Sequence, residues 1–312
     1  MLFPGQGSQA VGMGADLVEA YPEARDLFAR ADTLSGLPLS RLCFSGPLAT
    51  LTETRYAQPA LLVHSVAVLR VLESHRVHAA IVAGHSLGEY SALVAAGVLD
   101  FDAALRIVLR RGELMFDSGQ RQPGTMAAVV GLDTDAVESV CAEVRDIGVC
   151  DLANLNAPDQ VVISGAVEAV AAALPRLEAA GARMVKPLTV SGAFHSALMR
   201  RPGEQLASTL DEFRFDRARV PVVANVTGEP EQDGECLRDH LKRQIASPVR
   251  WVQSMRALRA RWPGPVLEVG AGNVLRGLLR RIDRSADCAS LGDRTALEDW
   301  LQKNLPPART AG

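Results

Sequence analysis

The segment GHSLG, residues 84–88, places one serine between two glycines at the point where an apolar run ends and a helical pattern begins. In such a strand-to-helix turn the serine is exposed on a strained backbone, and the residues two positions away must be small. Backbone N–H groups at the start of the following helix point toward the serine and can stabilise an oxyanion. The pattern therefore predicts that Ser86 is a nucleophile, although the same pattern also occurs by chance in chains rich in glycine and serine.

A serine nucleophile needs a base, and the chain has six histidines. Four of them fit surface or structural positions by their local sequence: His64, His75, His78 and His240. His85 adjoins Ser86, and adjacent side chains on a tight turn diverge. His195 follows an expected strand and precedes an expected helix, where catalytic groups often lie. Since no acidic residue stands out near His195 in the sequence, elimination favours a Ser-His pair and supports no Ser-His-Asp triad.

Two structural units are expected to position these residues. Helices are predicted over 13–32, 58–75, 87–97 and 101–117. Short buried strands are predicted at the N-terminus, with two or three residues, and at 79–83. A loose tail is expected over 306–312. The order βαββαβ at 122–188 is that of a ferredoxin-like unit. We therefore predict a large α/β core formed by 1–121 and 189–312, with a small subdomain at 122–188 inserted into it.

Composition and charge restrict the class of protein. The 312 residues are 48% hydrophobic and 22% charged, which is ordinary for a globular protein, and the net charge of −3 gives no reason to expect nucleic acid or an anionic membrane as partner. No apolar run approaches the roughly 20 residues of a membrane helix, and the first residues lack a signal-peptide pattern. The five scattered cysteines favour reduced thiols over a disulfide framework. We expect a soluble cytoplasmic α/β protein.

Other glycine-rich segments do not fit phosphate-binding motifs. In EVGAGNVLRG, Leu275 takes the place of the third glycine of a dinucleotide fingerprint, and FPGQGSQAVGMG lacks the G-K-[ST] of a Walker A loop. No histidine, cysteine or aspartate cluster has metal-ligand spacing. We therefore expect no bound cofactor and no metal.

Several segments together resemble one family, the malonyl-CoA:acyl-carrier-protein transacylases and the related acyltransferases of polyketide synthases. The matching segments are FPGQGSQ (3–9), QPALL (58–62), GHSLGEY (84–90), RGELM (111–115), NLNAPDQVVISG (154–165), GAFHSALM (192–199), NVTG (225–228), SPVRW (247–251) and EVGAGNVLRGLLRR (268–281). They span nearly the whole chain in the family's order. The resemblance implies an α/β-hydrolase-like parallel-sheet core with an inserted ferredoxin-like subdomain.

The resemblance also implies a mechanism. Ser86 is expected to attack the thioester of malonyl-CoA while His195 takes its proton, and Gln6 together with the backbone N–H of Leu87 is expected to form the oxyanion hole. The phosphopantetheine thiol of a holo acyl carrier protein would then take the malonyl group, giving ping-pong kinetics. In the family a backbone carbonyl orients the histidine, here that of Ser247.

Substrate contacts follow from the same resemblance. Arg111 matches the arginine that binds the malonyl carboxylate, a role suited to a planar guanidinium, whereas its local pattern alone favours a solvated helix face. Phe194, before the histidine, matches the malonyl pattern of polyketide acyltransferases, although it would also suit a core aromatic. His85 and Asn156 are further expected substrate contacts.

The acidic carrier protein should dock on a basic face. Candidates flanking the expected cleft are Arg183, Lys186, Arg276, Arg280 and Arg281. The main prediction is a monomeric malonyltransferase of fatty acid or polyketide biosynthesis. Two alternatives stay open: a serine acyl hydrolase or thioesterase acting on acyl carrier protein, and a catalytically idle carrier-protein docking module.

Overall fold

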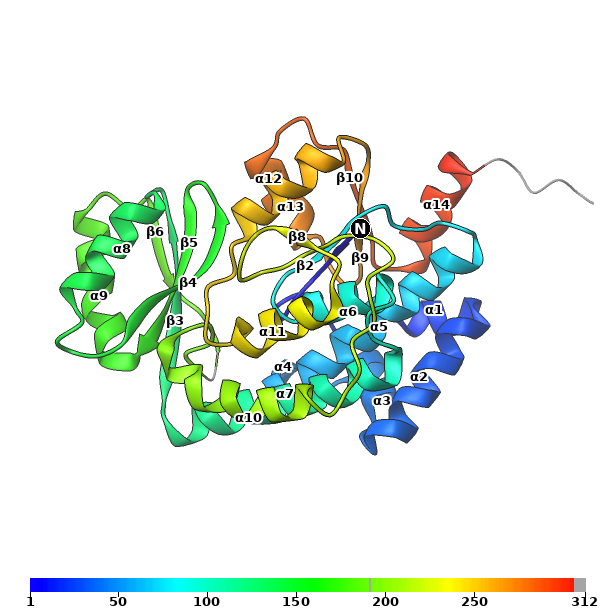
Figure 1. Cartoon of the computed structure of the whole chain (residues 1–312), viewed down its shortest axis with the longest axis horizontal. Helices are drawn as coiled ribbons and strands as arrows, with labels where there is room; N and C mark the ends of the chain where they lie inside the picture. The colour runs from blue at the N-terminus through cyan, green and yellow to red at the C-terminus, as the bar shows by residue number, and fades with distance from the viewer. Residues whose placement is uncertain (191, 306–312) are drawn as a thin grey trace, which may run out of the picture.

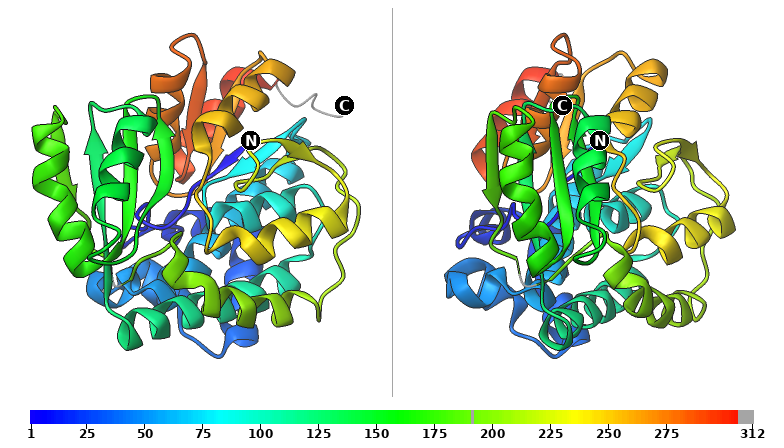
Figure 2. Two further views of the ribbon diagram at one scale, coloured as in Figure 1. Left: turned by 60° about the vertical axis from the view of Figure 1, so that its left-hand side comes forward. Right: turned by 90° about the vertical axis from the view of Figure 1, so that its left-hand side faces the viewer.

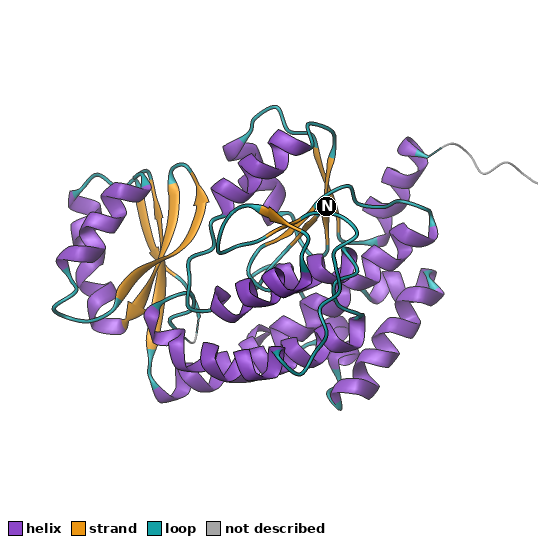
Figure 3. Ribbon diagram, viewed as in Figure 1, coloured by secondary structure: helices purple, strands orange, loops and turns teal. Residues whose placement is uncertain are grey.

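The computed structural model describes residues 1–190 and 192–305, so the tail expected over 306–312 lies outside the described residues. These residues form two separate β-sheets with helices packed around them (Figures 1 and 3). No helix in this part of the chain is long and apolar enough to cross a membrane.

The larger sheet has six strands in the order β10-β9-β1-β2-β7-β8. Its strands are β1 (Leu2–Phe3), β2 (Val82–Gly84), β7 (Val222–Val223), β8 (Pro230–Glu231), β9 (Val266–Val269) and β10 (Cys288–Leu291). All neighbours are parallel except β7 and β8. The first strand has two residues, as predicted, and it pairs with β2. Because β1 and β2 are adjacent and parallel, the loops that follow them meet at one edge of the sheet, where ligands of α/β proteins bind.

Twelve α-helices and one 3₁₀ helix, counted over the described residues, accompany this sheet. They are α1 (Ala15–Ala20), α2 (Pro22–Ser35), α3 (Leu39–Ser45), α4 (Leu48–Thr52), α5 (Thr54–Ser74), α6 (Gly88–Ala95), α7 (Phe101–Arg121), η1 (Ala197–Met199), α10 (Arg200–Leu210), α11 (Gly234–Gln244), α12 (Trp251–Arg261), α13 (Val274–Ile282) and α14 (Arg294–Asn304).

The single helix expected over 13–32 is wrong, because the chain forms α1 and α2 there. Tyr21 between them is extended, with φ −123° and ψ 118°. It precedes Pro22, and a proline ring disfavours the helical conformation of the residue before it. Helix α5 in turn begins at Thr54 rather than at 58, with Pro59 inside it.

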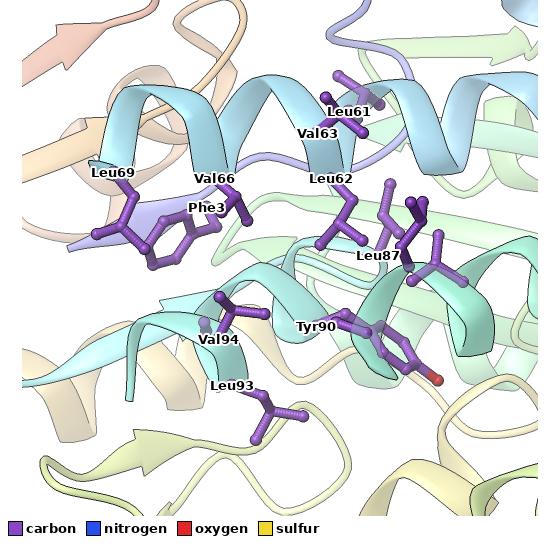
Figure 4. Close-up of a cluster of buried hydrophobic side chains, with 14 of the residues drawn as sticks. Phe3, Leu61, Leu62, Val63, Val66, Leu69, Leu87, Tyr90, Leu93 and Val94 are labelled. Carbon is purple, nitrogen blue, oxygen red and sulfur yellow. The ribbon is translucent and has the colours of Figure 1, made fainter. Parts of the chain in front are cut away.

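The core beneath the Ser86 turn packs α5 against α6 and β1 (Figure 4). Phe3, Leu62, Val66, Tyr90 and Val94 all contribute buried side chains to it. Helix α5 is apolar around most of its circumference, which is typical of a helix inside a core. This packing fixes α6 and therefore the turn at its start.

The second sheet has four antiparallel strands in the order β4-β5-β3-β6. Its elements follow in the chain as β3 (Gly124–Val130), α8 (Thr134–Glu143), β4 (Cys150–Ala157), β5 (Gln160–Ala166), α9 (Val167–Ala179) and β6 (Met184–Pro187). They enclose an apolar cluster of their own and lie to one side of the larger sheet (Figure 2). Backbone hydrogen bonds tie β4 to the larger unit: Leu155 N–H donates to Val249 O at 2.9 Å, and Val249 N–H to Ala153 O at 2.8 Å.

Candidate active site

Ser86 stands on the turn between β2 and α6 with a φ of 50°, a backbone conformation uncommon outside glycine. A Cβ on Gly84 would lie 1.9 Å from the backbone of Gly88, and a Cβ on Gly88 would lie 2.0 Å from the carbonyl oxygen of Phe3. The close approach of three backbone segments therefore requires both glycines. The strained turn predicted from the G-x-S-x-G pattern is confirmed.

His195 lies beside Ser86 although 109 residues separate them in the chain. Its Nε2 is 2.8 Å from Ser86 Oγ, and its Nδ1 is 3.0 Å from the carbonyl oxygen of Gln244 and 3.1 Å from that of Ser247. Since carbonyls only accept, Nδ1 carries the proton and Nε2 accepts from the serine hydroxyl. The carbonyl expected from Ser247 is therefore one of two that orient the ring.

The electrostatic environment keeps the His195 imidazole neutral. The residue is 4% exposed, and burial, followed by the positive charge of Arg111, lowers the pKa of its imidazole to about 3. A neutral ring with a free Nε2 lone pair can take the proton of Ser86.

Arg111 is buried, being 1% exposed, so the solvated helix face favoured by its local pattern is wrong. Its Nη2 donates to Ser86 Oγ and to Gln244 Oε1, both at 3.0 Å, and its Nη1 donates to Gln58 Oε1 at 2.6 Å. All of these hydrogen-bond partners, the ones found among residues 1–190 and 192–305, are neutral groups. Because a buried cation without an anionic partner is unfavourable, the site is electrostatically suited to an anionic ligand.

Gln6 and Leu87, the two residues expected to form the oxyanion hole, lie at the same cavity as Ser86. Gln6 follows β1 and Leu87 precedes α6, and both line the cavity. Neither backbone N–H has a protein acceptor among the described residues. The loop of Gln6 is held close because a Cβ on Gly5 would lie 2.4 Å from the carbonyl oxygen of His85. Two unpaired donors beside a serine are the arrangement that an oxyanion needs.

The cavity has a volume of about 360 Å³, and much of its wall is apolar. Its apolar side chains are Leu87, Met115, Met126, Leu188, Val190 and Phe194. Phe194 is 5% exposed, so it is both a core aromatic and a wall of the cavity. An apolar cavity with a few convergent polar groups is typical of a site for a small organic substrate.

His85 and Asn156 bond to one another, with His85 Nε2 2.8 Å from Asn156 Oδ1. His85 lines the cavity and packs edge-on against Trp251, with ring centroids 5.2 Å apart. Asn156 is not among the residues that line the cavity, whereas Asn154 is. The pair connects the Ser86 turn to β4 of the smaller sheet.

The five basic residues expected to bind a carrier protein are all exposed. Two of them are engaged in ion pairs, because Arg281 donates to Asp159 at 2.6 Å and Arg183 to the same carboxylate at 3.3 Å. Lys186, on β6, lies two residues before the cavity-lining Leu188. In the described part of the chain no group of histidine, cysteine, aspartate or glutamate side chains could hold a metal.

Residues 1–305 match the family described as acyl transferase domain. This chain belongs to the acyl transferase family. It is 43% identical over 302 residues to the malonyl CoA-acyl carrier protein transacylase of Escherichia coli O157:H7, covering 96% of this chain and 98% of that protein.

Solved structures of malonyltransferases share the fold of this acyl transferase. A malonyl-transacylase in complex with its type II PKS acyl-carrier protein superposes with a TM-score of 0.93 at 42% identity, covering 97% of this chain and 99% of that one. An acyl carrier protein S-malonyltransferase of Vibrio cholerae gives a TM-score of 0.92 at 41% identity, covering 96% and 98%. The expected mixed α/β fold with a parallel-containing sheet is confirmed.

Sequence reasoning missed four buried residues whose hydrogen bonds hold Ser86 and Arg111 of this acyl transferase in place, either directly or through one another. Asn225 Oδ1 accepts from Ser86 N–H at 2.7 Å, and its Nδ2 donates to the carbonyl oxygen of Gly84 at 2.7 Å. The other three are Gln58, Glu89 and Gln244. Three of the four lie in segments that match the family: Asn225 in NVTG, Gln58 in QPALL and Glu89 in GHSLGEY. The family resemblance of these segments could therefore have pointed to them. Gln244 lies outside every matching segment, and only the folded structure reveals it.

Proposed function

We propose that this protein is a malonyl-CoA:acyl-carrier-protein S-malonyltransferase of fatty acid or polyketide biosynthesis. The observation that carries the substrate assignment is the buried guanidinium of Arg111, whose Nη2 lies 3.0 Å from Ser86 Oγ and whose protein partners are neutral. A malonyl group ends in a carboxylate, which a guanidinium can bind through two parallel hydrogen bonds. The names of the relatives at 42–43% identity agree with this assignment.

In the first half-reaction, Ser86 Oγ bonds to the thioester carbonyl carbon of malonyl-CoA while its proton passes to Nε2 of His195. The N–H groups of Gln6 and Leu87 stabilise the oxyanion. When the carbon–sulfur bond breaks, the sulfur takes the proton from His195. CoA is then released, and the malonyl group remains as an ester on Ser86. The two carbonyls at Nδ1 hold the imidazole in place through both proton transfers.

In the second half-reaction, the phosphopantetheine thiol of an acyl carrier protein gives its proton to His195 and its sulfur attacks the ester. Collapse of the oxyanion returns the proton to Ser86 Oγ and releases malonyl-carrier protein. The protein itself needs no bound cofactor for these steps, since phosphopantetheine arrives on the carrier. Ser86, His195, Gln6, Leu87 and Arg111 are thus the proposed catalytic and substrate-binding groups.

We also propose that residues 1–121 and 189–312 form an α/β-hydrolase-like core and that 122–188 form a ferredoxin-like subdomain. The order βαββαβ and the strand order β4-β5-β3-β6 support the second assignment. A monomer in the cytoplasm is the proposed state, and the five free cysteines agree with a reducing compartment.

Intact-protein mass spectrometry after brief incubation with malonyl-CoA, methylmalonyl-CoA or acetyl-CoA tests the function. We expect one malonyl adduct, absent from Ser86→Ala and discharged by holo acyl carrier protein. Steady release of free acid without transfer would establish the hydrolase instead. An intact fold with no adduct and no released acid would indicate a docking module.

A further inference from the structure

Glu89 is the second residue of α6 and lies three residues after Ser86. It is 1% exposed, which is unusual for a carboxylate. Its carboxylate contacts neither Ser86 Oγ nor the imidazole of His195 among the hydrogen bonds of the described residues. Glu89 therefore has no direct part in the proton transfers, and its burial calls for another explanation.

Both oxygens of Glu89 accept hydrogen bonds from residues far away in the chain. Oε2 accepts from Gln244 Nε2 at 2.6 Å, and Oε1 accepts from the backbone N–H of Asn225 at 3.3 Å. Asn225 in turn holds the N–H of Ser86 through its side chain. The carboxylate thus bonds to two residues that both contact the Ser86 turn.

The amide of Gln244 is the junction between Glu89 and Arg111. Its Nε2 donates to Glu89 Oε2 and, at 2.9 Å, to the carbonyl oxygen of Ser86, while its Oε1 accepts from Arg111 Nη2 at 3.0 Å. An amide has one donor end and one acceptor end. Two acceptors on one side, Glu89 and the Ser86 carbonyl, direct the NH₂ toward themselves, and the oxygen must then face the guanidinium.

We propose that Glu89 is a positioning residue for substrate selection. Its carboxylate fixes the orientation of the Gln244 amide, and the Gln244 oxygen then holds the guanidinium of Arg111 beside Ser86, where it selects an acyl group that carries a carboxylate. This inference rests on the proposed malonyltransferase function and deepens it.

The electrostatics around Glu89 agree with this arrangement. Burial, only partly offset by the hydrogen bonds from Gln244 and Asn225 and by the charge of Arg111, raises the pKa of its carboxyl to about 7. Glu89 reaches Arg111 only through Gln244, so the guanidinium has no anionic partner in direct contact and can still bind an anionic ligand.

The test compares Glu89→Gln with the wild type in single-turnover acylation of Ser86 by malonyl-CoA and by acetyl-CoA. The new amide can present an NH₂ to Gln244, which turns the Gln244 amide and brings its NH₂ against Arg111. We expect the malonyl-to-acetyl ratio of acylation rates to fall roughly tenfold or more, the effect of one charge-assisted hydrogen bond. The matched control is Glu268→Gln, which alters a buried carboxylate bonded to Leu275, Arg276 and Ser290 and should leave the ratio unchanged.

A double-mutant cycle shows whether Glu89 acts through Gln244. In a Gln244→Met background, Glu89→Gln should cause no further change in the ratio. If Glu89→Gln does not fold, Glu89→Asp takes its place, because a carboxylate one methylene shorter leaves Gln244 Nε2 without its 2.6 Å partner. Equal losses with both acyl donors, or an unchanged ratio, would overturn the positioning role and leave the function intact. A wild type that takes up no malonyl group would overturn both.

Discussion

The guanidinium of Arg111 donates a hydrogen bond to the hydroxyl oxygen of Ser86 at 3.0 Å. The proposed nucleophile and the proposed carboxylate-binding group are therefore in direct contact before any substrate arrives. This contact places a cation within a few ångströms of the carbonyl that Ser86 would attack.

Replacing Arg111 by alanine should lower the rate of Ser86 malonylation by about 10²-fold or more, because the carboxylate loses its charge-assisted hydrogen bonds in a buried site. Acylation by acetyl-CoA should fall far less, since it needs no such partner. The neighbouring Arg110 is the matched control: its side chain is 45% exposed and pairs with an exposed Glu113, so Arg110→Ala should change either rate less than about twofold. A parallel fall with both acyl donors in Arg111→Ala would contradict the selecting role.

The imidazole of His195 should stay neutral across the range in which an ordinary histidine titrates. Burial and then the charge of Arg111 lower its pKa to about 3, and the depressed value means that the ring binds its second proton only in strong acid. NMR of the imidazole nitrogens, assigned by comparison with His195→Gln, should show no titration between pH 8 and 5. In Arg111→Ala the pKa should rise because one repelling charge is gone. A midpoint near 6.5 in the wild type would show that the ring is solvated.

Gly88→Ala should destabilise the fold by more than about 2 kcal/mol. The added Cβ would lie 2.0 Å from the carbonyl oxygen of Phe3, so β1 and α6 would have to move apart. Malonylation should fall as well, since Gln6 follows β1. Thermal unfolding and acylation rates measure the two effects. The control is Gly277→Ala in α13, where an added Cβ would meet no neighbouring element of the described residues within 4 Å. This substitution should stabilise the fold by about 0.5–1 kcal/mol, because alanine favours a helix more than glycine does. Equal stabilities for the two variants would contradict the close packing at the turn.

Carrier-protein docking should depend on Lys186 and Arg280, which are exposed and take no part in the ion pairs of Asp159. Charge reversal of both to glutamate should slow transfer to holo acyl carrier protein roughly tenfold at low salt and less at high salt, with loading from malonyl-CoA unchanged. Arg41→Glu, on the distant α3, serves as the control (Figure 1). A fall in both half-reactions, or in neither, would place the docking surface elsewhere.

Features that depend on neighbouring residues could be predicted from the amino-acid sequence alone. Five consecutive letters identify the Ser86 turn, in which Gly84 faces the backbone of Gly88, although Gly88 itself faces Phe3 of the distant β1. The short first strand and the order βαββαβ followed from runs of apolar residues and turn signals. His195 was favoured by elimination among six histidines, and in the structure its Nδ1 faces the carbonyl oxygens of Gln244 and Ser247.

The groups that surround Ser86 come together only when the chain folds. The local pattern around Arg111 predicts a solvated arginine, yet the fold buries it against Gln58 and Gln244. These two residues lie 53 and 133 positions away from Arg111 in the chain, on other helices. Glu89, Asn225 and Gln244 likewise bond across more than 130 residues. Such contacts arise when separate elements pack together, so no local pattern encodes them. A buried charge is positioned by the whole set of groups that satisfy it, and that set exists only in the folded chain.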